Sequence, residues 1–364
     1  MTAALIAFAI VIALSFFGIR IGFASLAVGF LGVALERGIN AGFTLVGQQV
    51  LDDAMNYNLS VIPLFILMGT FIHRSEVSND LYNVAYAGLS RIRGGLAYST
   101  VVACAGFSAV CGSSLATAAT MTKVGMPSMQ KFQYSPSLAT GTIAAGGTLG
   151  IMIPPSVPLV IYGLVTQQDI GHLFLAGIVP GLLLVLSFLI VVGLWVRVNP
   201  DAAPYDEDGL DHTSKRKSVL AIIPILGLFV LVLGGIYSKI FTPTEAAGVG
   251  AVGAAVIALA RGHLWKLSEW RDALVETITS TASLFMVLFG ALVFMQYITL
   301  TGMPFDLMFW VEDMGLSPLG LVIMVIVIAL LMGMVFEAIG ILLLLVPVFL
   351  PALELAGVDI IWFG

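Results

Sequence analysis

The sequence predicts an all-α polytopic membrane protein with inverted repeats, two opposed re-entrant helical hairpins and broken transmembrane helices. Three observations carry this prediction: the scarcity of charge, the length of the uncharged stretches, and a pattern that recurs in the two halves. Hydrophobic residues make up 59% of the 364 residues and charged residues 10%, against about 25% charged residues in a soluble domain. The apolar stretches do not alternate with polar residues as barrel strands would, so the spans are expected to be helices.

Long uncharged stretches mark the expected membrane segments, since a bilayer core of roughly 30 Å takes about 20 apolar residues of helix. They are Ala3–Gly18, Gly22–Leu35, Leu59–Ile72, Leu173–Val196, Val219–Tyr237, Ala246–Ala260, Ile278–Leu300 and Leu319–Leu350. The first stretch lacks a basic flank and a small-residue cleavage site. We therefore interpret residues 1–55 as retained N-terminal membrane helices.

The basic residues indicate how the chain crosses the bilayer. All Lys and Arg residues except Arg37 and Lys239 fall on one side if the N-terminus is outside and residues 94–131 enter and return on that side. Cytoplasmic loops carry the excess of Lys and Arg, so 94–131 is expected to be a cytoplasmic re-entrant hairpin. The later loops Thr301–Pro318 and Ala352–Asp359 hold acids without a basic residue, which predicts a second hairpin at 319–350 from the opposite face.

The two hairpins share a spacing. Ser113 lies 14 residues before Pro127, and Glu337 lies 14 residues before Pro351. Opposed hairpins with a common spacing are what an inverted repeat produces.

The repeats are placed at residues 56–163 and 277–364. The first repeat continues into a broken helix at 137–163. The second stops where its equivalent should begin, so we expect the natural chain to be longer. Connecting helices at 164–276 are expected to include a cytoplasmic loop at 199–217 and an amphipathic interfacial helix at 264–276.

The broken elements suggest chemistry. The helix at 137–163 is expected to be interrupted by Gly146-Gly147 and by Pro154-Pro155-Ser156, because proline lacks an N–H and clashes with the preceding turn. Unpaired carbonyl groups and hydroxyls suit Na⁺, and free N–H groups at a helix N-terminus attract a carboxylate. The hairpin tip at Gly112–Ser114 is expected to face this break. The alternative is that the hydroxyls bond back to their own helices.

The candidate ion- and substrate-binding residues are Gly112, Ser113, Ser114, Thr117, Gly147, Thr148, Pro154, Pro155, Ser156, Gly333 and Glu337, with Ser113, Ser114 and Thr148 as Na⁺ ligands. Glu337 is an acid inside an apolar hairpin, which suggests either ion coordination or capping of the hairpin tip. Glu245 follows Thr242-Pro243-Thr244 and is interpreted as part of a structural capping box.

Several other features argue against an enzyme. The four histidines are scattered at segment ends and are interpreted as interfacial, and Cys104 and Cys111 as small packing residues. No HExxH, GxSxG or Walker motif and no nucleophile–base pair is present. An intramembrane enzyme would need a partner for Glu337, and a passive channel would need a continuous pore rather than two dead-end hairpins.

Four segments together resemble the large membrane subunit of TRAP (tripartite ATP-independent periplasmic) transporters, the DctM type: the tip CGSSLATAATM, the break GGTLGIMIPPSVPLVIYG, the connector FTPTEAAGVGA and the second hairpin MGMVFEAIGILLLLVPVFLP. The resemblance runs along the whole chain, although the family's second Pro-Pro motif is absent, which leaves the second ion site unassigned.

The resemblance implies an elevator-like carrier of the ion-transporter superfamily in the bacterial inner membrane. It would couple Na⁺ to uptake of a C4-dicarboxylate, sialic acid or similar organic acid, without a covalent cofactor or a nucleic-acid partner. The implied partners are a small four-helix membrane subunit (DctQ type) and a periplasmic substrate-binding protein (DctP type). The alternative is a stand-alone organic-anion carrier of the same superfamily that needs no binding protein.

Overall fold

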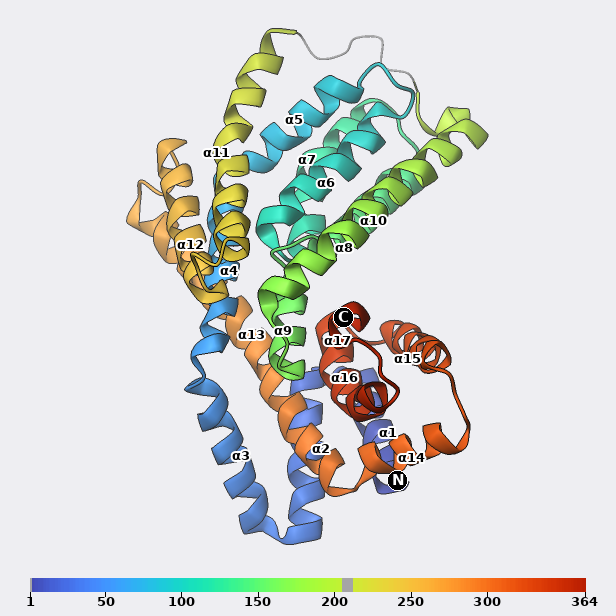
Figure 1. Cartoon of the computed structure of the whole chain (residues 1–364). Helices are drawn as coiled ribbons and strands as arrows, with labels where there is room; N and C mark the ends of the chain where they lie inside the picture. Colours follow the sequence, from blue (N-terminus) through green and yellow to red (C-terminus); the bar gives the residue numbers. More distant parts are fainter. Residues whose placement is uncertain (1, 205–211) are drawn as a thin grey trace. The chain divides into compact units, whose positions relative to one another are not determined.

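The computed structural model describes residues 2–204 and 212–364, and it describes the side chains of all of these except 212–221. All regular secondary structure in these residues is helical, which confirms the all-α prediction (Figure 1). The acidic run Asp206–Asp211 of the predicted cytoplasmic loop lies outside the described residues, and so do the side chains of its basic run Lys215–Lys217.

The helices follow one another along the whole chain: α1 (Thr2–Phe16), α2 (Ile21–Arg37), α3 (Ile39–Ala54), η1 (Tyr57–Ser60), α4 (Val61–Arg74), α5 (Val77–Leu89), α6 (Gly95–Cys111), α7 (Ser114–Lys131), α8 (Pro136–Met152), α9 (Val157–Thr166), α10 (Ile170–Val198), η2 (Pro200–Ala202), α11 (His212–Tyr237), α12 (Pro243–Ala260), α13 (Leu267–Leu300), α14 (Met303–Asp313), α15 (Pro318–Gly333), α16 (Ala338–Leu355) and α17 (Ile360–Phe363).

Several of these helices suit a membrane. Among the described residues, five helices are long and apolar enough to cross a bilayer, or six if the bent pair Ile39–Ala54 and Tyr57–Arg74 is one broken span. α6 and α15 are shorter apolar helices, and each is the first helix of a helical hairpin. The chain is therefore a multi-span helical membrane protein.

The chain divides into two compact units, which are described separately. The first unit comprises Met1–Ser60, Val160–Asp169 and Thr279–Gly364, and the second comprises Val61–Leu159 and Ile170–Ile278. The sequence-predicted repeats therefore do not coincide with these units, since residues of the first repeat occur in both.

Close helix contacts in the first unit depend on glycine. A Cβ at Gly29 of α2 would lie 2.7 Å from Phe294 Cα, and a Cβ at Gly22 would lie 2.5 Å from Met286 O. Small residues at these positions let the backbones of α2 and α13 approach, as they do in other membrane helix pairs. Also in this unit, the buried Tyr162 donates a hydrogen bond from its hydroxyl to Ile360 O at the start of α17, 2.5 Å away.

The second unit is built around α4, α6, α7 and α8. The α6–α7 pair is an antiparallel hairpin, because a turn joins the helices at one end and Leu96 N donates to Tyr134 Oη at the other, 3.4 Å apart. Burial raises the pKa of the Tyr134 phenol above its usual range. This side chain closes the base of the hairpin.

Predicted boundaries differ from the structure in several places, and one is the segment expected as the loop Thr301–Pro318, most of which is the helix α14. The interfacial helix expected at 264–276 is not a separate element, because α13 runs without interruption from Leu267 to Leu300. No proline or other strong helix breaker follows Glu276, so the backbone has no reason to stop where the charges end. Likewise, α11 begins at His212, inside the loop expected to extend to residue 217.

Candidate functional site

The hairpin tip is a two-residue turn built from small residues. α6 ends at Cys111, and Gly112 adopts a left-handed conformation (φ 64°) while its N–H donates to Ser108 O, 3.1 Å away. Glycine is favoured there because it has no Cβ to clash. Ser113 is extended and caps α7, with its Oγ accepting from Ala116 N at 3.4 Å. Glycine and serine thus reverse the chain within two residues.

The break between α8 and α9 is set by its prolines. α8 ends at Met152, Ile153 is extended (φ −82°, ψ 122°), and the Pro154–Pro155 peptide bond is cis. Pro154, Pro155 and Pro158 have no N–H, so the carbonyls four residues before them lose their helical donors. Of these, Ile151 O is recovered by the Ser156 hydroxyl, which donates to it at 2.5 Å.

The expected interruption at Gly146-Gly147 is wrong, because α8 remains helical to Met152. These glycines are required for close packing instead. A Cβ at Gly146 would lie 2.6 Å from Cys104 Sγ, and one at Gly147 would lie 2.7 Å from Ala118 Cβ. Gly147 therefore lets α8 pack against the hairpin but does not expose backbone groups.

The tip and the break contact each other directly. A Cβ at Gly112 would lie 2.6 Å from Pro155 O, and Val157 N donates to Gly112 O at 3.3 Å. One turn earlier on α8, a Cβ at Gly150 would lie 2.5 Å from Ser113 O. Only glycine leaves room for these backbone-to-backbone contacts, so two interrupted helices meet at one point of the second unit.

Unpaired backbone oxygens collect at this meeting point. Among the described residues, no backbone N–H donates to the carbonyls of Val110 and Cys111 at the end of α6. The same is true of Gly150 and Pro154 beside the break. A buried carbonyl without a donor is costly, and a small hard cation is one way to satisfy several such oxygens together.

Two of the candidate hydroxyls bond back to their own backbone, as the alternative interpretation proposed. Thr117 Oγ1 donates to Ser113 O at 2.8 Å, and Thr148 Oγ1 donates to Ala145 O at 2.6 Å. A hydroxyl that donates its hydrogen still has lone pairs for a cation, so this bonding does not remove the side chains from the candidate site. Ser114 is half-buried and its hydroxyl has no hydrogen bond among the described residues.

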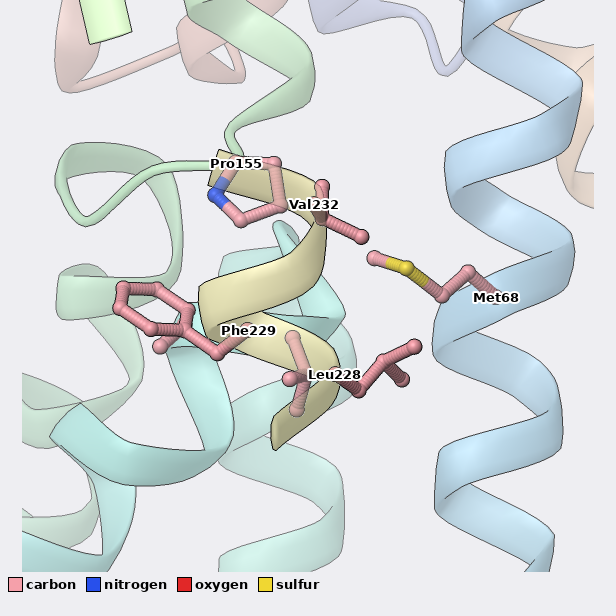
Figure 2. A pocket seen from close by; sticks show the side chains of 7 residues that line it. Met68, Pro155, Leu228, Phe229 and Val232 are labelled. Carbon is pink, nitrogen blue, oxygen red and sulfur yellow. The ribbon is translucent and has the colours of Figure 1, made fainter. Parts of the chain in front are cut away.

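A wholly apolar recess lies behind the break. Figure 2 shows Met68, Pro155, Leu228, Phe229 and Val232 around it, and Ala109 and Val110 complete the lining. The recess leaves no room for a water molecule. The recess therefore offers neither a polar group nor space for an ion or a polar ligand.

Gly333, the last residue of α15, and Glu337, immediately before α16, lie in the first unit. Glu337 is the N-terminal capping residue of α16 (φ −69°, ψ 152°), but its exposed side chain makes no capping hydrogen bond. The capping interaction considered for it is therefore not observed. The described geometry does not place these two residues with the tip and the break, because they belong to the other unit.

Glu245 forms the predicted capping box. Thr242 N donates to Glu245 Oε2 at 2.8 Å, and Glu245 N donates to Thr242 Oγ1 at 3.3 Å. The structural interpretation of this acid is confirmed.

Sequence reasoning missed two polar groups near the tip. His73, interpreted as interfacial, is half-buried, and its Nδ1 lies 2.8 Å from Thr120 Oγ1 of the hairpin. Ser108, one turn before the tip, is fully buried, and its hydroxyl has no hydrogen bond among the described residues. The sequence gives no signal for either residue, because the burial and hydrogen bonding of each side chain depend on which helix packs against it.

A family model and curated relatives match this chain over most of its length, and all of them belong to one transporter family. A family model described as "Tripartite ATP-independent periplasmic transporter, DctM component" matches residues 4–364. The C4-dicarboxylate TRAP transporter large permease protein of Pseudomonas aeruginosa is 37% identical over 317 residues, covering 87% of this chain and 73% of the relative. The sialic acid TRAP transporter large permease protein of Vibrio cholerae is 31% identical over 358 residues, covering 96% of this chain and 81% of the relative.

A solved structure shares the fold. The YdaH transporter of Alcanivorax borkumensis superposes with a TM-score of 0.60 at 17% sequence identity, covering 89% of this chain and 75% of that one. At this level of identity, the similarity supports the architecture alone.

Proposed function

We propose that this chain, which belongs to the DctM component family of tripartite ATP-independent periplasmic transporters, couples Na⁺ to the uptake of a small carboxylate. The family assignment makes it the large permease of such a transporter, a multi-pass protein of the bacterial inner membrane rather than an enzyme. The proposed substrates are a C4-dicarboxylate, sialic acid or a similar organic acid. The range stays open because the two relatives above are named for different substrates.

The observation that carries the coupling proposal is the contact between the hairpin tip and the broken helix. Two helices end at the same point of the second unit, and unpaired carbonyls, the hydroxyls of Ser113 and Ser114 and the oxygen of Thr148 lie on these two elements. Oxygen-only ligand sets of this kind suit Na⁺ rather than a softer metal. Thr117 and Ser156 would hold the surrounding backbone.

Glu337 and Gly333 are proposed to supply an equivalent element from the second hairpin. The support is the matching helix–turn–helix pattern, with a short interruption between α15 and α16 and the same 14-residue spacing to a proline. On this proposal, the two hairpins are inverted repeats of an elevator-like carrier.

The word tripartite implies two further components. We propose that they are a small four-helix membrane subunit and a periplasmic binding protein that delivers the substrate. The family assignment favours this arrangement over a stand-alone organic-anion carrier.

The test of the coupling proposal is a Na⁺ titration of substrate uptake in proteoliposomes that contain the complete transporter. Ser114→Ala removes one candidate ligand and leaves the carbonyls in place. The loss of one neutral ligand should cost on the order of 1–3 kcal/mol, by analogy with an unmade buried polar contact. That corresponds to roughly a 5- to 150-fold higher half-saturating Na⁺ concentration, with partial recovery of uptake at high Na⁺.

Ser187→Ala is the matched control, because the Ser187 hydroxyl donates to Leu183 O of its own helix α10. It should leave the Na⁺ dependence unchanged. Unaltered half-saturation in both Ser113→Ala and Ser114→Ala would remove these side chains from the ion site. Uptake by the parent protein that proceeds equally well without a Na⁺ gradient would refute coupling itself.

A further inference from the structure

One turn of α4 bridges two other elements of the second unit. Thr70, His73 and Arg74 lie three and four residues apart and so share a face of the helix. His73 Nδ1 is hydrogen-bonded to Thr120 Oγ1 of α7 at 2.8 Å. Arg74 donates to Glu276 Oε2 of α13 at 2.8 Å, and Thr70 Oγ1 lies 3.4 Å from Thr277 Oγ1. The end of α4 thereby connects the hairpin to the first turns of α13.

The bond from His73 reaches the hairpin close to its tip. Thr120 is only 2% exposed, and its hydroxyl bonds to the imidazole rather than back to its own helix. Three residues earlier on α7, Thr117 holds the tip carbonyl of Ser113 with both its N–H (3.1 Å) and its hydroxyl (2.8 Å). Residues three apart lie on one face of a helix. The imidazole therefore contacts α7 at Thr120, one turn after Thr117, whose N–H and hydroxyl orient the Ser113 carbonyl.

α4 also contacts the other helix of the hairpin. A Cβ at Gly69, one turn before His73, would lie 3.1 Å from Cys111 O. The imidazole itself meets Phe107 of α6 edge-on, with 6.5 Å between ring centroids. Both helices of the hairpin, α6 and α7, therefore pack against α4. His73 makes the only side-chain hydrogen bond that the described residues show between α4 and α7.

We propose that His73 is a positioning residue for the cation site, and that it sets the Na⁺ affinity by holding α7, and with it the Ser113 and Ser114 hydroxyls at the start of that helix, in the ion-binding arrangement. This inference rests on the proposed function. Without the bond, α7 has more freedom to slide or rotate, and a smaller fraction of molecules presents the tip oxygens correctly. Apparent affinity falls by that fraction, whereas saturating Na⁺ restores the ordered tip and the maximal rate.

Paired substitutions isolate the hydrogen bond. His73→Asn places an amide near the position of Nδ1 and can keep the bond to Thr120, whereas His73→Gln carries its amide further out, near the position of Nε2. On the partner, Thr120→Ser keeps the hydroxyl and Thr120→Val replaces it with a methyl group of similar size. His263→Gln, in the turn after α12, is the control, because that side chain has no hydrogen bond among the described residues.

Two measurements on the complete transporter test the proposal: half-saturating Na⁺ for uptake in proteoliposomes, and the Na⁺-dependent rise in the thermal unfolding temperature of the purified permease complex. The loss of one neutral hydrogen bond should raise half-saturating Na⁺ about 2- to 10-fold in His73→Gln and Thr120→Val. The maximal rate at saturating Na⁺ should be retained. His73→Asn, Thr120→Ser and His263→Gln should behave as the parent, and His73→Gln combined with Thr120→Val should be no worse than either alone.

The outcomes separate the positioning role from the proposed function. If the parent protein shows no Na⁺ dependence in either measurement, the coupling proposal fails. If the parent responds to Na⁺ but the His73 and Thr120 variants all keep its half-saturation, the positioning role is refuted. Equal shifts in His73→Asn and His73→Gln, or a fall in stability and maximal rate without a change in Na⁺ affinity, would also refute it. Should a His73 variant fail to assemble, the Thr120 pair decides.

Discussion

Gly150 shows how a single missing side chain allows the candidate site to form. Its Cα faces Ser113 O, and an added Cβ would lie 2.5 Å from that oxygen. The neighbour is backbone at a constrained turn, so it cannot move aside as a flexible side chain would. Overpacking of this kind costs about 1–3 kcal/mol.

We therefore predict that Gly150→Ala lowers the thermal stability of the permease by that amount and abolishes most uptake at low Na⁺. Gly141→Ala is the control in the same helix, because a Cβ there has nothing within 4 Å. At an open helical position, alanine is about 1 kcal/mol more favourable than glycine, so this variant should be as stable as the parent or more so. Similar behaviour of the two variants in thermal unfolding and uptake would contradict the close contact.

The same residues show what the sequence could and could not predict about the site. The proline break was predictable, because Pro154 and Pro155 remove hydrogen-bond donors wherever they occur. The role of Gly147 was not, because a glycine in a helix serves either to interrupt it or to admit a neighbour, and only the opposing Ala118 decides. His73 was missed for the same reason: its partner Thr120 is 47 residues away.

Helical hairpins are the elements on which the transport proposal depends. In α6 and α7 the tip is formed by two residues and the base is closed by Tyr134. Each helix is 17 or 18 residues long, or about 25–27 Å at 1.5 Å per residue. Helices of that length could cross most of a bilayer core of roughly 30 Å, which supports the proposed re-entrant hairpin.

We predict that both ends of this hairpin are cytoplasmic. Single cysteines introduced as Arg93→Cys and Lys131→Cys, both at exposed positions, should react with a membrane-impermeant maleimide only from the cytoplasmic side. Glu354→Cys, in the last turn of α16 and in the acidic segment expected outside, should react only from the periplasmic side. The native Cys104 and Cys111 are free but buried, so they should contribute little background. Labelling of Arg93→Cys and Lys131→Cys from opposite sides would contradict the inverted repeat.

Element boundaries were predictable where backbone chemistry fixes them. The tip at Gly112-Ser113 and the capped start of α12 at Thr242 follow from residues that favour turns and caps, and the structure has both. The interfacial helix was wrong because its boundary was inferred from charge alone. Charge indicates the depth at which a segment lies, whereas a helix ends only where its backbone hydrogen bonding is interrupted, and α13 has no such point near Glu276.

At the scale of the whole molecule, composition established a helical membrane protein, and the order of motifs along the chain indicated the family. The two compact units were not predictable from the repeats. Val160–Asp169, which begins within the first repeat and runs past its predicted end at residue 163, packs in the first unit, where Tyr162 bonds to Ile360 of the second repeat. A repeat describes how a sequence arose, whereas a compact unit describes which surfaces are buried together, and the two need not coincide.

Delivery of the substrate can be tested with the complete transporter. If this permease acts in a tripartite system, substrate reaches it from a binding protein that captures the substrate at low concentration and docks on the periplasmic face. We expect proteoliposomes with the two membrane components to show no uptake above background from free substrate under an inward Na⁺ gradient. Addition of the substrate-loaded binding protein should start uptake, and collapse of the gradient with a Na⁺ ionophore should stop it.

A binding protein from an unrelated transporter, loaded with the same substrate, controls for simple delivery of ligand. Equal uptake of free substrate without any binding protein would show instead that the permease is a stand-alone carrier, because the substrate would then enter the site without a docking partner.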